Sequence, residues 1–145
     1  MEPMTLRKVR AYSQLVQRVT SALDRAQDAK LVLRDVTPER QSYALLKVVL
    51  GSGNPQRALI TAGIHGDEPI GVEALCTFLD KGLYRSWAHQ WELTVLPCVN
   101  PWGYEHRRRT DQDGRDLNRE FKSEHPPSEV RFMQSLDFGR YELSL

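Results

Sequence analysis

The stretch that decides the fold is Leu59-Ile60-Thr61-Ala62-Gly63-Ile64-His65-Gly66-Asp67-Glu68, which is followed by Pro69. Its apolar part, 58–62, predicts a buried strand, and a proline suits the first turn of a helix, so we expect a helix directly after the turn. His65 and Glu68 would then lie at the carboxyl end of a strand, where open α/β sheets place their sites.

Three elements are predicted before this strand. Apolar residues recur at helical spacing over residues 8–26 and predict an amphipathic helix; they are Tyr12, Leu15, Val16, Val19, Leu23 and Ala26. Leu31 and Leu33 alternate with polar neighbours, and 43–50 is almost wholly apolar, so both segments are expected to be strands. The turn Gly-Ser-Gly-Asn-Pro, 51–55, separates them from the strand 58–62.

The alternation of helix and strand continues after the turn. Apolar residues cover much of the circumference of the segment 69–82, which predicts a well-buried helix. We then expect a strand over 91–99, a long loop over 102–127, a helix capped by Ser128, and a strand that begins at 141. The predicted fold is a single α/β domain of three layers, α/β/α, with a mixed sheet.

Composition and charge argue against several function classes. The chain has 20 Lys plus Arg and 19 Asp plus Glu, so its formal net charge of +1 gives no global electrostatic case for binding nucleic acid. No segment approaches a membrane span or a signal peptide, so we expect no membrane partner and a cytoplasmic location. Cys76 and Cys98 fall in apolar patterns and are expected to be small buried thiols rather than a disulfide or a metal pair.

His65 and Glu68 stand three residues apart in a glycine-rich turn. Such a pair can direct an imidazole nitrogen and a carboxylate at one ion, and His with Glu is a usual partial ligand set for catalytic zinc. The alternative is a plain helix-entry turn, in which Glu68 favours the helix N-terminus through its charge and His65 is a surface residue. The tetrapeptide alone leaves both interpretations open.

A second polar cluster follows the strand 91–99. Arg109, Asn118 and Arg119 are close enough along the chain to converge in one loop system. The planar guanidinium of arginine matches a carboxylate or a developing oxyanion, and asparagine can add a further donor. Asp116 can hold a neighbouring arginine or a backbone amide in place.

Together these motifs resemble the zinc carboxypeptidases of the M14 metallopeptidase family. His65-Gly66-Asp67-Glu68 is similar to the family's His-x-x-Glu zinc motif, and Asn100-Pro101-Trp102-Gly103 is similar to its Asn-Pro-x-Gly turn. Arg109 and the segment 114–119 are similar to its Arg and Gly-x-Asp-x-Asn-Arg elements. The resemblance covers roughly residues 40–145.

The resemblance implies a role for each of these residues. His65 and Glu68 would bind one Zn²⁺, Arg109 would be catalytic by polarising the scissile carbonyl and stabilising the oxyanion, and Asn118 with Arg119 would bind the substrate's terminal carboxylate. The implied partner is a peptide or amino-acid derivative with a free carboxylate. Because His and carboxylate also suit other divalent ions, zinc is favoured by the resemblance alone.

The family's third zinc ligand and its catalytic Glu have no counterpart in the sequence, which ends at Leu145 within the last predicted strand. His106 and His125 do not stand where the third ligand is expected. We therefore expect residues 1–145 to be the N-terminal portion of one zinc carboxypeptidase-like catalytic domain, incomplete at its C-terminus, with an N-terminal helix (1–28) and an α/β core (29–145). Alone it should have little peptidase activity, bind zinc weakly and self-associate through the truncated sheet.

Two other functions stay open. The succinylglutamate desuccinylase and aspartoacylase group shares the His-x-x-Glu and Asn-Arg elements but cleaves an N-acyl amino acid. The Asn-Pro-x-Gly turn and the Gly-x-Asp-Leu-Asn-Arg form favour the peptidase over this group. A non-catalytic domain that keeps the fold and binds carboxylates or a partner protein is the third hypothesis, which the missing ligand supports.

Overall fold

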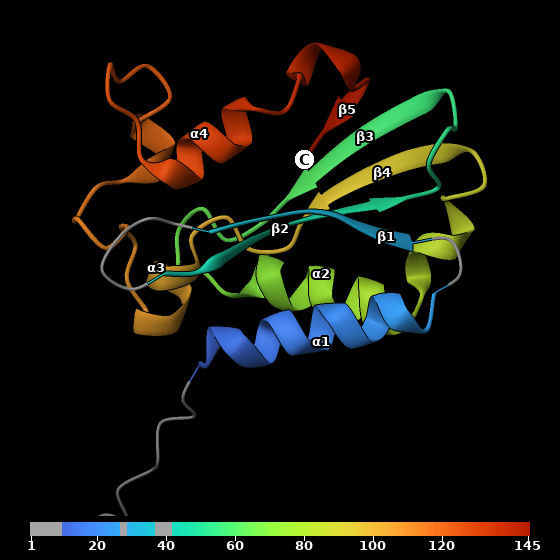
Figure 1. The fold of residues 1–145 in the computed structure, drawn as a ribbon, viewed down its shortest axis with the longest axis horizontal. Coiled ribbons are helices and arrows are strands. Elements are labelled where there is room, and N and C mark those ends of the chain that lie inside the picture. The colour runs from blue at the N-terminus through green and yellow to red at the C-terminus, as the bar shows by residue number, and fades with distance from the viewer. Residues whose placement is uncertain (1–9, 27–28, 37–41) are drawn as a thin grey trace, which may run out of the picture.

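The computed structural model describes residues 10–26, 29–36 and 42–145, in which a mixed sheet of five strands forms the centre (Figure 1). In their spatial order the strands are β1 (Ala29–Val36), β2 (Ala44–Leu50), β4 (Trp91–Leu96), β3 (Gln56–Thr61) and β5 (Leu143–Ser144). β2 is antiparallel to both of its neighbours, whereas β3 is parallel to β4 and β5. The predicted mixed sheet is confirmed.

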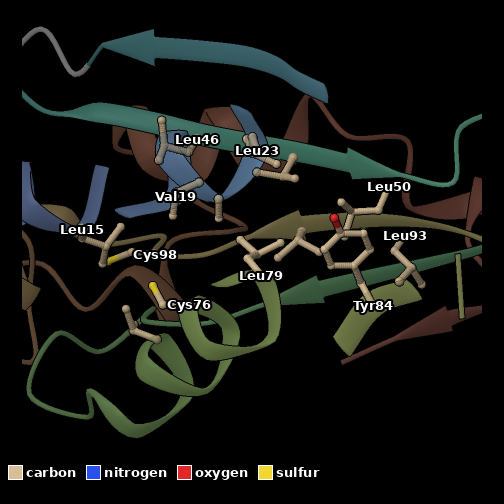
Figure 2. Packing of buried hydrophobic residues seen from close by; sticks show 14 of the residues in the cluster. Leu15, Val19, Leu23, Leu46, Leu50, Cys76, Leu79, Tyr84, Leu93 and Cys98 are labelled. Carbon is tan, nitrogen blue, oxygen red and sulfur yellow. The ribbon is translucent and has the colours of Figure 1, made fainter. Parts of the chain in front are cut away.

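Two helices, α1 (Tyr12–Asp24) and α2 (Ile70–Asp80), cover one face of the sheet (Figure 1). Residues three and four apart lie on one side of a helix, so the apolar stripe of α1 faces the strands. Figure 2 shows Val19 and Leu23 of α1 beside Leu46 of β2, and all three belong to one buried cluster. The helix predicted over 8–26 is present but shorter at both ends, since α1 covers Tyr12–Asp24; positions 8 and 9 lie outside the described residues.

The opposite face of the sheet is covered by α4 (Ser128–Gln134) (Figure 1). Adjacent residues of a strand point to opposite faces, so Leu45 joins a second buried cluster with Val130 and Met133 of α4, while Leu46 packs with α1. Helices on both faces of one sheet make the three-layer α/β/α arrangement that the sequence predicts.

The helix α2 is less buried than predicted. Its core-facing residues are Val72, Cys76 and Leu79, which form a single stripe at helical spacing. Ile70, in the first turn, is 83% exposed. The expectation of a well-buried helix is wrong, because only one side of α2 reaches the sheet. The short 3-10 helix η1 (Leu83–Ser86) follows it.

The segment 102–127 is not the plain loop that the sequence predicts. It begins inside the helix α3 (Pro101–His106) and contains the 3-10 helix η2 (Leu117–Arg119). The helix α3 begins here because the side chain of Asn100 accepts a hydrogen bond from the Gly103 amide at 2.9 Å and Pro101 occupies the first helical turn. The Asn-Pro pair therefore starts a helix.

Ser128 does not cap α4, contrary to the prediction. The N-cap position is Pro127, and the Ser128 hydroxyl lies 3.1 Å from a carboxylate oxygen of Glu129 instead. After α4, the 3-10 helix η3 (Phe138–Arg140) leads into β5, an edge strand of the sheet. The strand predicted from 141 is thus present but short.

Both cysteines are free and buried, as predicted. Burial raises the pKa of the Cys76 thiol to about 11 and also raises the pKa of Cys98, so neither is a ready nucleophile or metal ligand at neutral pH. Within the described part of the chain, no helix combines the length and apolar character that crossing a bilayer requires.

Candidate active site

The turn that carries His65 and Glu68 leaves the carboxyl end of β3 and runs beside the segment that follows β4. The Val99 amide donates to the Ala62 carbonyl and the Asn100 amide donates to the Gly63 carbonyl, each at 2.9 Å. Gly63 has a φ of 73°, a left-handed conformation that favours glycine. This bend takes the chain out of the sheet, so His65 and Glu68 lie beyond the carboxyl end of β3, as expected from the sequence.

His65 lies between two carboxylates. Its Nε2 is 3.1 Å from Oδ1 of Asp116, and its Nδ1 is 3.6 Å from Oε1 of Glu68. The side chain of His65 is only 11% exposed, so its ring cannot rotate freely away from these partners. A carboxylate on one ring nitrogen fixes the orientation of the imidazole and leaves the other nitrogen available to a metal, here Nδ1 on the side of Glu68.

Asp116 joins the second cluster to the first. Its Oδ2 accepts a hydrogen bond from Nε of Arg109 at 3.1 Å, and its Oδ1 accepts one from the backbone amide of Asn118 at 3.1 Å. Burial alone would raise the pKa of Asp116, but the hydrogen bonds from His65, Arg109 and the Asn118 amide outweigh it and hold that pKa below its ordinary value. The sequence predicts the arginine and amide contacts of Asp116; its contact with His65 was missed.

Arg109 completes the connection between the two motifs. Its Nη1 lies 3.6 Å from Oε1 of Glu68, the same oxygen that faces His65. A guanidinium donor and an imidazole nitrogen therefore both lie 3.6 Å from one carboxylate oxygen. Arg109 is about half exposed, with a side-chain relative accessibility of 49%, and can reach a ligand from the open side.

Asn100 is a site residue whose role the sequence did not reveal. Its side chain is completely buried, and its amide nitrogen donates to the carbonyls of Ile64 at 3.3 Å and Thr110 at 3.1 Å. It thereby ties the residue before His65 to the residue after Arg109. A polar residue at the end of an apolar strand was the available signal, because buried amides need partners.

Close backbone packing also fixes the turn that carries His65 and Glu68. A Cβ atom on Gly66 would lie 1.9 Å from the backbone carbon of Gly103, so the second residue of the His-x-x-Glu motif and the last of the Asn-Pro-x-Gly motif touch backbone to backbone. Only glycine permits this approach at position 66. The two motifs are therefore neighbours in space because of their glycines.

The remaining predicted site residues lie at the surface. Asn118 and Arg119 are exposed, and Nε of Arg119 is 3.7 Å from Oδ2 of Asp116. Both residues lie close to Asp116, which contacts His65 and Arg109, and their side chains are open to solvent. His106 and His125 are also exposed, and His106 is hydrogen-bonded to the Trp102 carbonyl at 2.9 Å.

The donor set at His65 fits a zinc ion in part. Two ligand atoms that each lie about 2.0–2.2 Å from one zinc are at most about 4.3 Å apart, and Nδ1 of His65 and Oε1 of Glu68 are 3.6 Å apart. Among the residues described here, no group of three or more His, Cys, Asp or Glu side chains could hold a metal ion. Among the described residues, His65 and Glu68 are thus the candidate ligands, two in number.

A cavity of about 500 Å³ opens beside these two side chains. Its lining includes His65, Glu68, Gly71 and the apolar Ile64 and Ile70. The exposed position of Ile70 places an apolar wall next to the candidate metal ligands, so the site combines charged groups with an apolar surface.

Several solved structures share this fold. A metallo-carboxypeptidase from Burkholderia cenocepacia is 19% identical with a TM-score of 0.67, over 87% of this chain and 37% of that one. A succinylglutamate desuccinylase/aspartoacylase from Rhodobacter sphaeroides is 21% identical with a TM-score of 0.65, over 83% and 40%. A metallo-carboxypeptidase from Pseudomonas aeruginosa, solved with (2-guanidinoethylmercapto)succinic acid, is 18% identical with a TM-score of 0.63, over 92% and 37%. At these identities the likeness shows the fold, and the chain spans less than half the length of each structure.

The family model for the succinylglutamate desuccinylase/aspartoacylase catalytic domain matches residues 54–134. The chain belongs to this family. The matched segment runs from before β3 into α4 and includes both motifs of the site. Comparison with curated proteins finds no match.

The family assignment bears on the hypotheses that the sequence left open. The fold shared with metallo-carboxypeptidases confirms the predicted zinc carboxypeptidase-like architecture. The family itself is the hydrolase group placed second in the sequence analysis, whose catalytic domain is named for desuccinylase and aspartoacylase activities. Both hydrolase hypotheses are compatible with this site.

Proposed function

We propose that the chain supplies the metal-binding and carboxylate-binding part of a metal-dependent hydrolase that cleaves an amide bond in a carboxylate-bearing substrate. The observation that carries the proposal is the convergence of His65, Glu68 and Arg109, with Oε1 of Glu68 3.6 Å from both Nδ1 of His65 and Nη1 of Arg109.

Each residue has a chemical role in the proposal. His65 and Glu68 would hold the metal, which when bound supplies Lewis acidity toward a carbonyl and lowers the pKa of water. Arg109 would donate hydrogen bonds to the oxygen on which negative charge develops, and Asn118 with Arg119 would hold the carboxylate of the substrate. Asp116 would keep the imidazole of His65 in the orientation that presents Nδ1.

Two substrate classes suit this arrangement. Membership of the desuccinylase/aspartoacylase family favours an N-acyl amino acid as the substrate. The Pseudomonas aeruginosa neighbour carries a ligand with two carboxyl groups, which fits a carboxylate-binding arginine in that fold. A peptide with a free C-terminal carboxylate is the second candidate, because the Asn-Pro-x-Gly turn and the Gly-x-Asp-Leu-Asn-Arg segment have the form that the peptidases have.

Zinc binding tests the metal part of the proposal. The 145-residue chain is titrated with zinc in competition with a chromophoric chelator, and the chain should bind one ion weakly, since it supplies two ligands. His65→Ala and Glu68→Ala should abolish this binding. Asp67→Ala, an exposed position between the two ligands, is the matched control and should leave it unchanged. Binding that survives both ligand substitutions would overturn the assignment.

Turnover tests the reaction. The full reading frame of the gene is assayed with zinc against an N-acyl amino acid and against a C-terminal peptide, and hydrolysis of one of them should fall about 100-fold or more in the Arg109→Ala variant. A folded, zinc-binding protein that hydrolyses neither substrate would instead favour the non-catalytic, carboxylate- or protein-binding alternative. A 145-residue chain that turns over robustly with zinc would contradict the expectation that a third protein ligand is required.

The remaining expectations are part of the same proposal. A division of the chain into an N-terminal helix (1–28) and an α/β core (29–145), a cytoplasmic location and self-association through the edge strand β5 stay predictions. Leu143 and Leu145 are among the exposed apolar residues of that edge, which supports self-association. Size-exclusion chromatography with light scattering measures it directly.

A further inference from the structure

Arg10, near the N-terminus, contacts the turn between the two candidate metal ligands, although the two segments are far apart in the sequence. Its Nη1 donates a hydrogen bond to the Gly66 carbonyl at 3.1 Å. Arg10 precedes Ala11, the N-cap residue of α1, and both Arg10 and α1 lie outside residues 54–134, the segment that matches the family. The contact therefore links the metal turn to an element that the family match does not include.

Two carbonyls close to His65, those of Ile64 and Gly66, are held by different side chains. On the N-terminal side, the buried amide of Asn100 donates to the Ile64 carbonyl at 3.3 Å. On the C-terminal side, the guanidinium of Arg10 donates to the Gly66 carbonyl. With both carbonyls engaged, neither the peptide before His65 nor the peptide after Gly66 can rotate without breaking one of these bonds. Hydrogen bonds from a charged donor are the stronger kind.

Arg10 is itself held in place. Its guanidinium carbon lies 5.6 Å from the centre of the buried Tyr104 ring, a cation–π distance, and the Tyr104 hydroxyl is 3.1 Å from a carboxylate oxygen of Glu73 on α2. The position of Arg10 is thus set by its contact with the buried ring of Tyr104 on α3.

We infer that Arg10 is a positioning residue, which fixes the turn 65–68 in the geometry that presents His65 and Glu68 to a metal. The inference rests on the proposed function, because it assigns the purpose of the contact to metal binding. It predicts that removing the guanidinium weakens zinc binding, because Arg10 acts on the two ligands through the Gly66 carbonyl of the turn between them.

Zinc affinity is compared among the 145-residue chain and its Arg10→Ala, Arg10→Lys and Arg18→Ala variants, at a temperature where circular dichroism shows each to be folded. Arg10→Ala should weaken zinc binding about tenfold, the lower end of the effect of residues that orient metal ligands. Arg10→Lys should recover part of the loss, because an ammonium can still donate to the Gly66 carbonyl. Arg18→Ala removes an arginine of α1 that pairs with Glu73 and Asp80 rather than with the turn, and should leave zinc affinity unchanged.

A metal-free measurement separates this inference from the proposed function. In the zinc-free chain, the Glu68 amide donates to the His65 carbonyl at 3.2 Å, and its hydrogen exchange should be faster in Arg10→Ala but not in Arg18→Ala. If His65→Ala does not weaken zinc binding, the proposed function fails. The exchange rates would still decide whether Arg10 fixes the turn. Unchanged exchange and zinc affinity in Arg10→Ala, or equal losses in Arg18→Ala, would overturn the inference.

Discussion

The metal turn, residues 63–68, and the anion loop, residues 109–119, meet at Asp116 but are held in different ways. In the metal turn the His65 side chain is 11% exposed, and the backbone is fixed by close contact with Gly103. In the anion loop the Arg119 side chain is 81% exposed and its ion pair with Asp116 is long, at 3.7 Å. His65 is thus part of the packed interior, whereas Glu68, at 66% exposed, and Arg119 lie at the open side.

Under the proposed function, this difference matches what each half would bind. A metal ion requires donor atoms at fixed distances, within tenths of an ångström, so its ligands gain from a rigid backbone. An arginine that binds a carboxylate brings its own planar set of donors on a long side chain, and it needs to be open to a ligand. Substitutions of the packed residues Gly66 and Asn100 should therefore cost more stability than substitutions of the exposed residues Asn118 and Arg119.

The largest effect is expected for Gly66→Ala. The new Cβ would lie 1.9 Å from the backbone carbon of Gly103, so the turn or α3 must move, and we expect the free energy of unfolding to fall by about 3 kcal/mol or more. Urea unfolding measures it. The matched control is Gly71→Ala in α2, where the new Cβ would lie an ordinary 3.4 Å from the Cβ of Ala62. Because alanine favours a helix more than glycine does, the stability of this variant should be unchanged or slightly higher. Equal stabilities of the two variants would show that the close contact is not structural.

The next effect is expected for Asn100→Ala. It leaves the carbonyls of Ile64 and Thr110 and the Gly103 amide without their buried partner, which should lower the free energy of unfolding by about 2–3 kcal/mol. Asn118→Ala is the matched control in the anion loop, since Asn118 is exposed, and should cost less than about 0.5 kcal/mol. Similar costs from the two asparagines would remove the distinction between the halves.

The fold was predictable where one pattern determined one element. The apolar run at 58–62 and the turn at His65 predict the order of β3 and α2 correctly, because both depend on local preferences. The burial of α2 was predicted wrongly, since the exposure of Ile70 depends on how the helix sits on the sheet. The helix α3 was missed although Asn100 and Pro101 carry its start signal, because the same two residues also end a strand.

The candidate site could be proposed from the sequence as a set of residues but not as a set of contacts. His65, Glu68 and Arg109 could be named from motif spacing, and the structure brings them together. The contact of Asp116 with His65 and that of Arg10 with Gly66 could not be predicted, because each joins residues more than fifty positions apart through the packing of helices. Sequence patterns are local, whereas such contacts depend on the assembled core.

Asp116 links the two halves, and its substitution should have an intermediate effect on stability. Asp116→Ala removes the acceptor for His65, Arg109 and the Asn118 amide, and should lower the free energy of unfolding by about 1 kcal/mol. Asp116→Asn keeps an oxygen for the Asn118 amide but loses the charge beside His65. It should therefore be nearly as stable as the unsubstituted chain while binding zinc about tenfold more weakly. Wild-type zinc affinity in both variants would show that Asp116 does not orient His65.

The smallest effect on stability is expected for Arg119→Ala, the test of the exposed half. Its guanidinium is 81% exposed and pairs with Asp116 only at 3.7 Å, so the free energy of unfolding should change by less than about 0.5 kcal/mol. Arg109→Ala, which also removes contacts with Glu68 and Asp116 at 3.6 and 3.1 Å, is the comparison and should cost more. A loss above 1 kcal/mol in urea unfolding of Arg119→Ala would mean that this arginine supports the loop. A negligible loss would show that Arg119 is not needed for stability, which favours the proposed role of this exposed side chain in ligand binding.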